Sequence, residues 1–154
     1  MPTLAQYLEA AKDTKVHLVL ELKPHATPEA ETAAAEAVVK MVGRYGLSKR
    51  VTYISFSLHI MKELARLAPA KTQLMYLGGG TLPKDLKAME LTGCDFNYGV
   101  YLNNPTWLND IKALKMASNV WTVNNPADMI WAIENRVDFI TTDRPDLFLK
   151  LTRK

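Results

Sequence analysis

The feature that most constrains the fold is a repeated alternation of apolar, β-branched runs with segments of helical periodicity. We predict strands over residues 16–23, 51–56, 72–77, 96–102, 119–124 and 137–142. The distance from one strand start to the next is 18–35 residues, which accommodates a strand and a crossover helix. Such connections are right-handed and pair consecutive strands in parallel. The sequence therefore predicts an α/β protein built from parallel βα repeats.

Helix start and stop signals lie between these strands. Thr3 and Ser57 are typical N-caps, and Thr27-Pro28 places a cap before a proline in the first turn. The predicted helices cover residues 3–11, 28–46, 58–68, 83–91 and 143–151, and two more follow Asn104-Pro105 and Asn125-Pro126. Asn124 and Asp143 stand at strand ends, and we expect each to cap the helix that follows.

Two architectures remain open at this point: an open doubly wound sheet, or part of a closed eight-stranded barrel. A closed barrel typically takes about 250 residues and at least about 200. The chain has 154 residues, room for six strand-helix units. Because no composition shift or linker interrupts it, we expect a single domain over residues 1–154.

Composition and charge exclude several classes of partner. The 19 basic and 16 acidic residues give a net charge of +3 spread along the chain, so we expect no nucleic-acid partner and no polybasic membrane patch. The start, Met1–Lys15, lacks the pattern of a signal peptide, and no run is long enough for a membrane span. We expect a soluble protein and assign no compartment. The single cysteine, Cys94, forms neither an internal disulfide nor a thiol zinc site and is expected to be inert.

One strand carries charged residues in a chemically useful place. Along residues 16–23 the leucines alternate with a second set of side chains that includes Glu21 and Lys23. Both lie toward the carboxyl end of the strand, where parallel α/β folds bind ligands. A carboxylate there suits a hard divalent cation, and an ammonium suits a phosphate oxygen. The same spacing equally suits a structural Glu–Lys ion pair, so the residues alone leave both interpretations open.

Other polar residues have two interpretations each. His25, in the loop after this strand, is either a ligand contact or a solvated loop residue. Gly78-Gly79-Gly80 either presents N–H groups to a phosphate or forms a flexible loop. We expect His17 to be an interior residue and His59 to lie on a helix surface.

Four segments in order resemble the signature strands of the glycerophosphodiester phosphodiesterase family. They are LVLELKP at 18–24, ISF at 54–56, VWTVN at 120–124 and VDFITTDRP at 137–145. The opening Pro2-Thr3-Leu4 also matches the start of the second helix of that family. The resemblance implies a TIM-type barrel, in which the present strands are the third to the eighth. The chain is thus expected to be a partial barrel with six of eight units, a fragment of the family fold.

The resemblance also implies an activity and roles for three residues. The family hydrolyses glycerophosphodiesters to glycerol 3-phosphate and an alcohol, usually with Mg or Ca. Glu21 then corresponds to one metal carboxylate and Lys23 to a partner of the substrate phosphate. Trp121 corresponds to an apolar wall over the glycerol or leaving group, although plain packing is an alternative for this side chain.

The sequence departs from the family in its acid–base residues. The family uses a His-Arg-Gly segment, a Glu-x-Asp pair and a further histidine, and this chain contains neither His-Arg-Gly nor Glu-x-Asp. General acid–base assistance contributes about two to four orders of magnitude to a rate. We therefore assign no catalytic residue and expect the chain alone to be inactive or nearly so. The alternative is a non-enzymatic binding or assembly module on a truncated barrel.

Two partners are expected from this interpretation. One is a small phosphodiester, which the family resemblance implies as substrate. The other is a second copy of the chain, because the first and last strands of a partial barrel present unpaired backbone groups. We expect self-association through these open edges.

Overall fold

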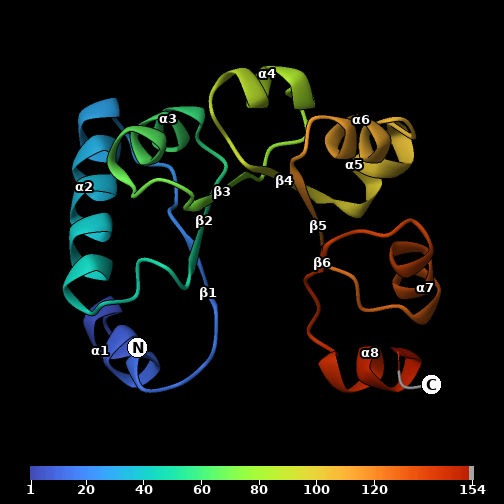
Figure 1. The fold of residues 1–154 in the computed structure, drawn as a ribbon, viewed down its shortest axis with the longest axis horizontal. Helices are drawn as coiled ribbons and strands as arrows, with labels where there is room; N and C mark the ends of the chain where they lie inside the picture. Colours follow the sequence, from blue (N-terminus) through green and yellow to red (C-terminus); the bar gives the residue numbers. More distant parts are fainter. Residues whose placement is uncertain (153–154) are drawn as a thin grey trace. The chain divides into compact units, whose positions relative to one another are not determined.

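Six strands alternate with helices over residues 1–152, the part of the chain that a computed structural model describes (Figure 1). The strands are β1 (Leu18–Glu21), β2 (Val51–Ser55), β3 (Gln73–Tyr76), β4 (Gly93–Asn97), β5 (Ala117–Trp121) and β6 (Phe139–Ile140). The helices are α1 (Leu4–Lys12), α2 (Pro28–Arg44), α3 (Leu58–Leu67), α4 (Pro83–Ala88), α5 (Tyr98–Asn103), α6 (Trp107–Ala113), α7 (Pro126–Glu134) and α8 (Pro145–Thr152). The predicted α/β class is confirmed.

The chain forms two compact units, Met1–Tyr76 and Leu77–Lys154. In the first unit β1 pairs with β2 and β2 with β3; in the second, β4 pairs with β5 and β5 with β6. Every one of these pairs is parallel and joins strands that are consecutive in sequence. The prediction of parallel βα repeats is therefore confirmed within each unit.

The first unit buries the leucine face of β1 under its helices. Leu18 and Leu22 are each 6% exposed, whereas Val19 is 56% exposed. Thr27 and Ser57 cap α2 and α3 as predicted, with side-chain oxygens that accept from backbone N–H groups of the first turn. Helices α2 and α3 lie side by side (Figure 1). The opposite side of β1, which includes Val19, faces away from this core.

Aromatic side chains form the centre of the second unit. The ring of Phe96 lies 5.7 Å from that of Tyr101 and 5.5 Å from that of Trp107, between ring centroids. The Tyr101 hydroxyl donates a hydrogen bond of 2.9 Å to the carbonyl of Asn119. Trp107 packs here at the start of α6 and is 9% exposed.

The predicted strand over 96–102 is wrong in its position. The strand β4 begins at Gly93, and residues 98–103 form the helix α5. Asn97 caps that helix, because its side-chain oxygen accepts the N–H of Gly99 at 2.9 Å. Residues 93–96 are all buried, so the strand takes the fully buried run and the asparagine ends it. The apolar residues after Asn97 show a helical face, with Tyr101 turned into the core.

Four helices end with the same backbone arrangement. After α2, α4, α6 and α7, a residue with positive φ donates its N–H into the last helical turn, and so does the next residue. The positive-φ residues are Gly46, Glu90, Lys115 and Arg136. This Schellman-type ending satisfies carbonyls that the helix leaves unpaired. At the three non-glycine positions the left-handed conformation costs about 1–2 kcal/mol.

None of the helices in residues 1–152 is long and apolar enough to cross a membrane. The longest of them, α2, has 17 residues and is amphipathic.

Arg50 anchors the end of α1 to the first unit. Its guanidinium donates to the carbonyls of Lys12 at 2.7 Å and Val16 at 3.3 Å, and also to the carbonyl of Thr14. It thus binds the carbonyl end of α1 and the segment that leads into β1. A cation at a helix C-terminus also complements the helix dipole.

Replacing Arg50 is expected to loosen α1. Arg50→Met removes several charge-assisted hydrogen bonds, and we expect a loss of about 1–2 kcal/mol in the free energy of unfolding. Amide exchange measured by mass spectrometry should accelerate in residues 4–17. Lys40→Met, at an exposed position inside α2, is the matched control and should change neither quantity appreciably; equal exchange in both variants would refute the anchoring role.

Candidate functional site

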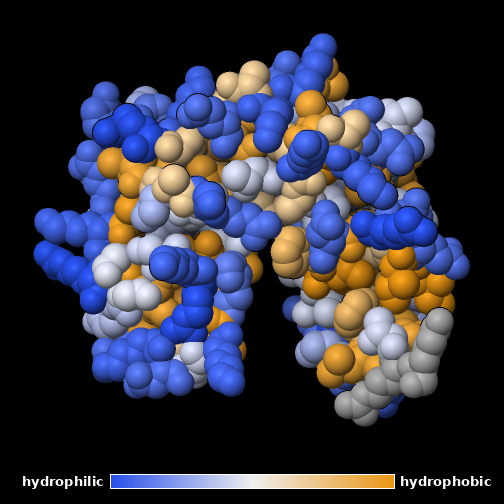
Figure 2. All heavy atoms as spheres, viewed as in Figure 1, coloured by the Kyte–Doolittle hydropathy of each residue, from blue (hydrophilic) through white to orange (hydrophobic). Residues whose placement is uncertain are grey.

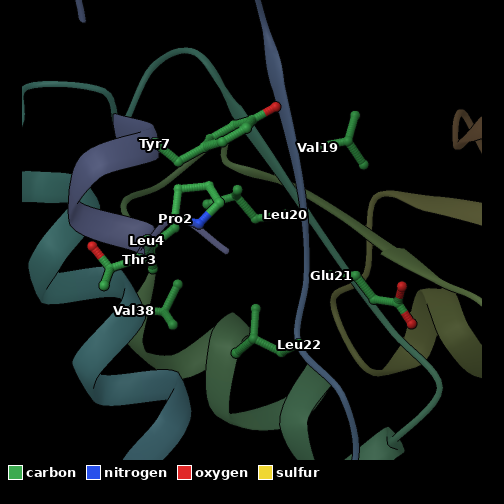
Figure 3. A pocket seen from close by; sticks show the side chains of 9 residues that line it. All are labelled: Pro2, Thr3, Leu4, Tyr7, Val19, Leu20, Glu21, Leu22 and Val38. Atoms are coloured by element: carbon green, nitrogen blue, oxygen red, sulfur yellow. The ribbon is translucent and has the colours of Figure 1, made fainter. Parts of the chain in front are cut away.

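Glu21 and Lys23 form an ion pair at the carboxyl end of β1. The Lys23 Nζ lies 2.6 Å from the Glu21 Oε1. The lysine side chain is 72% exposed and the glutamate side chain 28% exposed. Figure 3 shows the Glu21 carboxylate directed away from Leu20 and Leu22, on the same side of the strand as Val19. The structure thus brings together the two charged residues that the sequence singled out.

Leu22 lies between these two residues, and both of its backbone polar groups are hydrogen-bonded. The N–H of Leu22 donates to the carbonyl of Ile54 at 2.9 Å. The carbonyl of Leu22 accepts a 2.7 Å hydrogen bond from the Ser55 hydroxyl, which is fully buried. Ser55 therefore supports the site from the neighbouring strand, a role that the sequence gave no signal for.

A buried carboxylate holds the loop after β1. Glu31, 7% exposed in the first turn of α2, accepts the backbone N–H of His25 at 3.2 Å and the Ser57 hydroxyl at 2.7 Å. These bonds connect the loop after β1 with the N-terminus of α3. The sequence gives no signal for this role of Glu31, because an acidic residue in a first helical turn is ordinary.

The other histidines have side-chain partners within the fold. His17 is exposed and its Nε2 lies 2.9 Å from the hydroxyl of Thr52. The expected interior position is wrong, because the strand begins only at Leu18. His59 is half-buried, with its Nε2 2.9 Å from the Thr32 hydroxyl. His59 therefore packs between α2 and α3 and is not a plain surface residue.

A shallow groove of about 280 Å³ lies beside the pair, bounded by α1, β1 and α2 (Figure 3). Thr3, Glu21 and the Tyr7 hydroxyl are the polar side-chain groups of its lining, and the other side chains are apolar. The lining residues are Pro2, Thr3, Leu4, Tyr7, Val19, Leu20, Glu21, Leu22 and Val38.

The described residues do not by themselves fit a divalent cation. Over residues 1–152, no group of three or more His, Cys, Asp or Glu side chains is placed to hold a metal ion. The Glu21 carboxylate faces an ammonium, whereas Mg or Ca takes six or more oxygen ligands. Within residues 1–152, Glu21 is therefore one carboxylate, and a complete cation site needs further oxygen ligands beside it.

Trp121 lies in the second unit, at the end of β5. Its indole N–H donates to the carbonyl of Asp95 at 2.8 Å, and the side chain is half-buried. Val123 is 1% exposed and anchors the segment that follows. The indole is therefore fixed to β4 through its nitrogen while part of the ring stays accessible.

Asn124 and Asp143 bind each other, and the expectation that each caps a helix is wrong. The Asn124 amide donates to the Asp143 carboxylate at 2.8 Å, and the Asp143 N–H donates back to the Asn124 side-chain oxygen at 2.8 Å. Asn125 caps α7 instead, with its oxygen 2.9 Å from the N–H of Ala127. The pair joins the two segments that follow β5 and β6.

The glycine triplet includes a position of close packing. A Cβ at Gly79 would lie 2.3 Å from a methyl group of Val100. Glycine at position 79 therefore allows the close approach of Val100.

Parallel βα repeats with charged residues at a carboxyl strand end are typical of TIM-type barrel proteins. A family model described as the glycerophosphoryl diester phosphodiesterase family matches residues 1–147. This chain belongs to that family.

Known proteins support the same conclusion. A glycerophosphodiester phosphodiesterase from Parabacteroides distasonis is 47% identical and superposes with a TM-score of 0.95, over 97% of this chain and 63% of that one. A glycerophosphodiester phosphodiesterase from Caldanaerobacter subterraneus subsp. tengcongensis is 26% identical over 100% of this chain and 63% of its own length. A phosphodiesterase of Oleispira antarctica, in complex with the product sn-glycerol-3-phosphate, is 19% identical with a TM-score of 0.83, over 97% of this chain and 60% of its own.

These comparisons confirm the predicted family and the partial TIM-type barrel. The chain spans about 63% of the length of the first two relatives while nearly all of it matches them. The described residues therefore contain six of the eight strand-helix repeats of such a barrel.

We expect Cys94 to be unreactive in the folded protein. Burial, together with the charge of Asp95, raises the pKa of its thiol to about 12, so the thiolate is scarce at neutral pH. A thiol-specific disulfide reagent at pH 8 should therefore label Cys94 only after denaturant is added. Rapid labelling without denaturant would contradict this packing.

Proposed function

We propose that this chain carries part of a glycerophosphodiester-binding site and does not hydrolyse the substrate alone. In the first unit, Lys23 binds the phosphate and Glu21 supplies one carboxylate toward a divalent cation. In the second unit, Trp121 keeps the role that the family resemblance implies, an apolar wall for a glycerol or leaving group. The observation that carries this proposal is the exposed Lys23 ammonium at the carboxyl end of β1 in a chain that belongs to this family. The glycerol 3-phosphate complex of the Oleispira relative supplies the choice of ligand.

The chemistry of the described residues supports binding over turnover. An ammonium forms a charge-assisted hydrogen bond with a phosphate oxygen without any proton transfer. Hydrolysis also needs a positioned acid and base. The segments to which the family resemblance assigns that task are absent from the sequence, and His17 and His59 are engaged by threonine hydroxyls.

The test is a titration of the 154-residue protein with glycerol 3-phosphate, followed by amide chemical shifts. We expect shifts in residues 21–25 and a loss of affinity of roughly tenfold in Lys23→Met, because a charged hydrogen bond contributes about 1.5 kcal/mol. With glycerophosphocholine and Mg or Ca, we expect no hydrolysis above the buffer rate.

Lys12→Met is the matched control, because Lys12 also forms an exposed ion pair, with Glu9 on α1. It should leave the affinity unchanged. Hydrolysis that Glu21→Ala abolishes would contradict the proposed inactivity, and glycerol 3-phosphate shifts that persist in Lys23→Met would contradict the role of Lys23.

The exposed strand edges support self-association as a second part of the proposal. Within residues 1–152, β1 has β2 as its one strand neighbour and β6 has β5. Val19 on β1 is 56% exposed and Phe139 on β6 is 48% exposed. Unpaired edges with apolar side chains favour pairing with another chain. Figure 2 shows apolar residues at the surface over α7 and α8, and Ile130 and Leu149 of these helices are exposed.

We therefore expect the average mass in light scattering to rise above 17.3 kDa as the concentration increases. Val19→Lys should reduce this rise, since a lysine on an edge strand opposes strand addition. The matched control is Leu102→Lys, at a side chain that is 51% exposed on α5. A strictly monomeric wild-type protein at high concentration would exclude association through these edges and, with it, the alternative of an assembly module.

A further inference from the structure

The ammonium that we assign to phosphate binding already has an anionic partner. The Glu21 carboxylate lies 2.6 Å from the Lys23 Nζ, within the range of a charge-assisted hydrogen bond. A carboxylate and a phosphate oxygen present the same acceptor chemistry to an ammonium. The phosphate position beside Lys23 is therefore occupied by a group of the chain itself.

We propose that Glu21 is an internal counter-anion of Lys23, which a phosphate-bearing ligand must displace in order to bind. The inference rests on the proposed function, since it assumes that Lys23 receives the phosphate. It assigns Glu21 an autoinhibitory contact in the metal-free chain, which is separate from its role toward a cation.

The Glu21 and Lys23 side chains cannot separate through a movement of the backbone between them. Leu22 lies between them with its N–H bonded to Ile54 and its carbonyl bonded to Ser55. Glu21 and Lys23 are two residues apart and therefore project on the same side of the strand. The pair opens only when a side chain rotates, and Lys23, 72% exposed on a flexible stem, is the freer of the two.

The Glu21 charge persists after the pair opens. Its side chain is only 28% exposed, and it stays at the strand end where the phosphate arrives. Phosphate binding therefore requires the ion pair to open, which costs its interaction energy. The bound phosphate is also repelled by the nearby carboxylate. Both effects vanish when the carboxylate is replaced by a neutral amide of the same shape.

Glu21→Gln is therefore expected to strengthen anion binding. Exposed ion pairs contribute little, so the gain in affinity should be about two- to fivefold. The measurement is a titration with inorganic phosphate, and separately with glycerol 3-phosphate, at constant ionic strength with EDTA present. Amide shifts of residues 21–25 give the dissociation constants.

Two variants show that the gain acts through Lys23. In Lys23→Met, phosphate should bind weakly, and adding Glu21→Gln should raise its affinity less than in the wild-type background, because only the repulsion by the carboxylate is then removed. Glu9→Gln is the matched control: it neutralises the glutamate of the other exposed Lys–Glu pair, on α1, and should leave the affinity unchanged.

The outcomes separate this inference from the proposed function. Equal or weaker phosphate binding in Glu21→Gln, with wild-type binding that depends on Lys23, overturns the counter-anion and leaves the proposed function intact. Binding that is independent of Lys23 in every variant overturns both. A gain of the same size in the Lys23→Met background shows a general charge effect and also overturns the inference.

Discussion

Parallel pairing between consecutive strands is the constraint on which the structure depends. A strand that pairs in parallel with its predecessor requires a crossover, and here each crossover contains at least one helix. The crossover brings every carboxyl strand end of a unit to the same edge of its sheet. Glu21 and Lys23 therefore lie at that edge as a result of topology, before any specific contact is considered.

The positions of the site residues depend on polar groups in the neighbouring strand and helix. Ser55 and Ile54 bind the two backbone groups of Leu22, and Glu31 binds the loop that follows. In the second unit, the Trp121 indole is bonded to β4. The bonds of Ser55 and Glu31 are buried or partly buried, so their energetic value exceeds that of the exposed ion pair in the same unit.

Much of this arrangement followed from sequence periodicity, and the failures have physical causes. The alternation around Glu21 and Lys23 was sufficient to place both on one side of a strand end, since strand periodicity is strictly two. The apolar, aromatic residues after Asn97 suit a strand or a helix equally, and the hydrogen bond of the Asn97 side chain with Gly99 marks the helix. Ser55, Glu31 and the Asn124–Asp143 pair were not recognised, because their partners lie about 19–33 residues away or in ordinary loop positions.

The repeated helix ending has a consequence for how such a protein is put together. Because α2, α4, α6 and α7 each satisfy their last carbonyls with their own next residues, these helices need no hydrogen bonds from a neighbouring unit in order to terminate. At these helix ends, each strand-helix repeat makes its own backbone hydrogen bonds. It still needs the neighbouring repeats to bury its apolar side chains. A division between these strand-helix repeats exposes apolar surface and a strand edge, but leaves the C-terminal hydrogen bonds of these four helices intact.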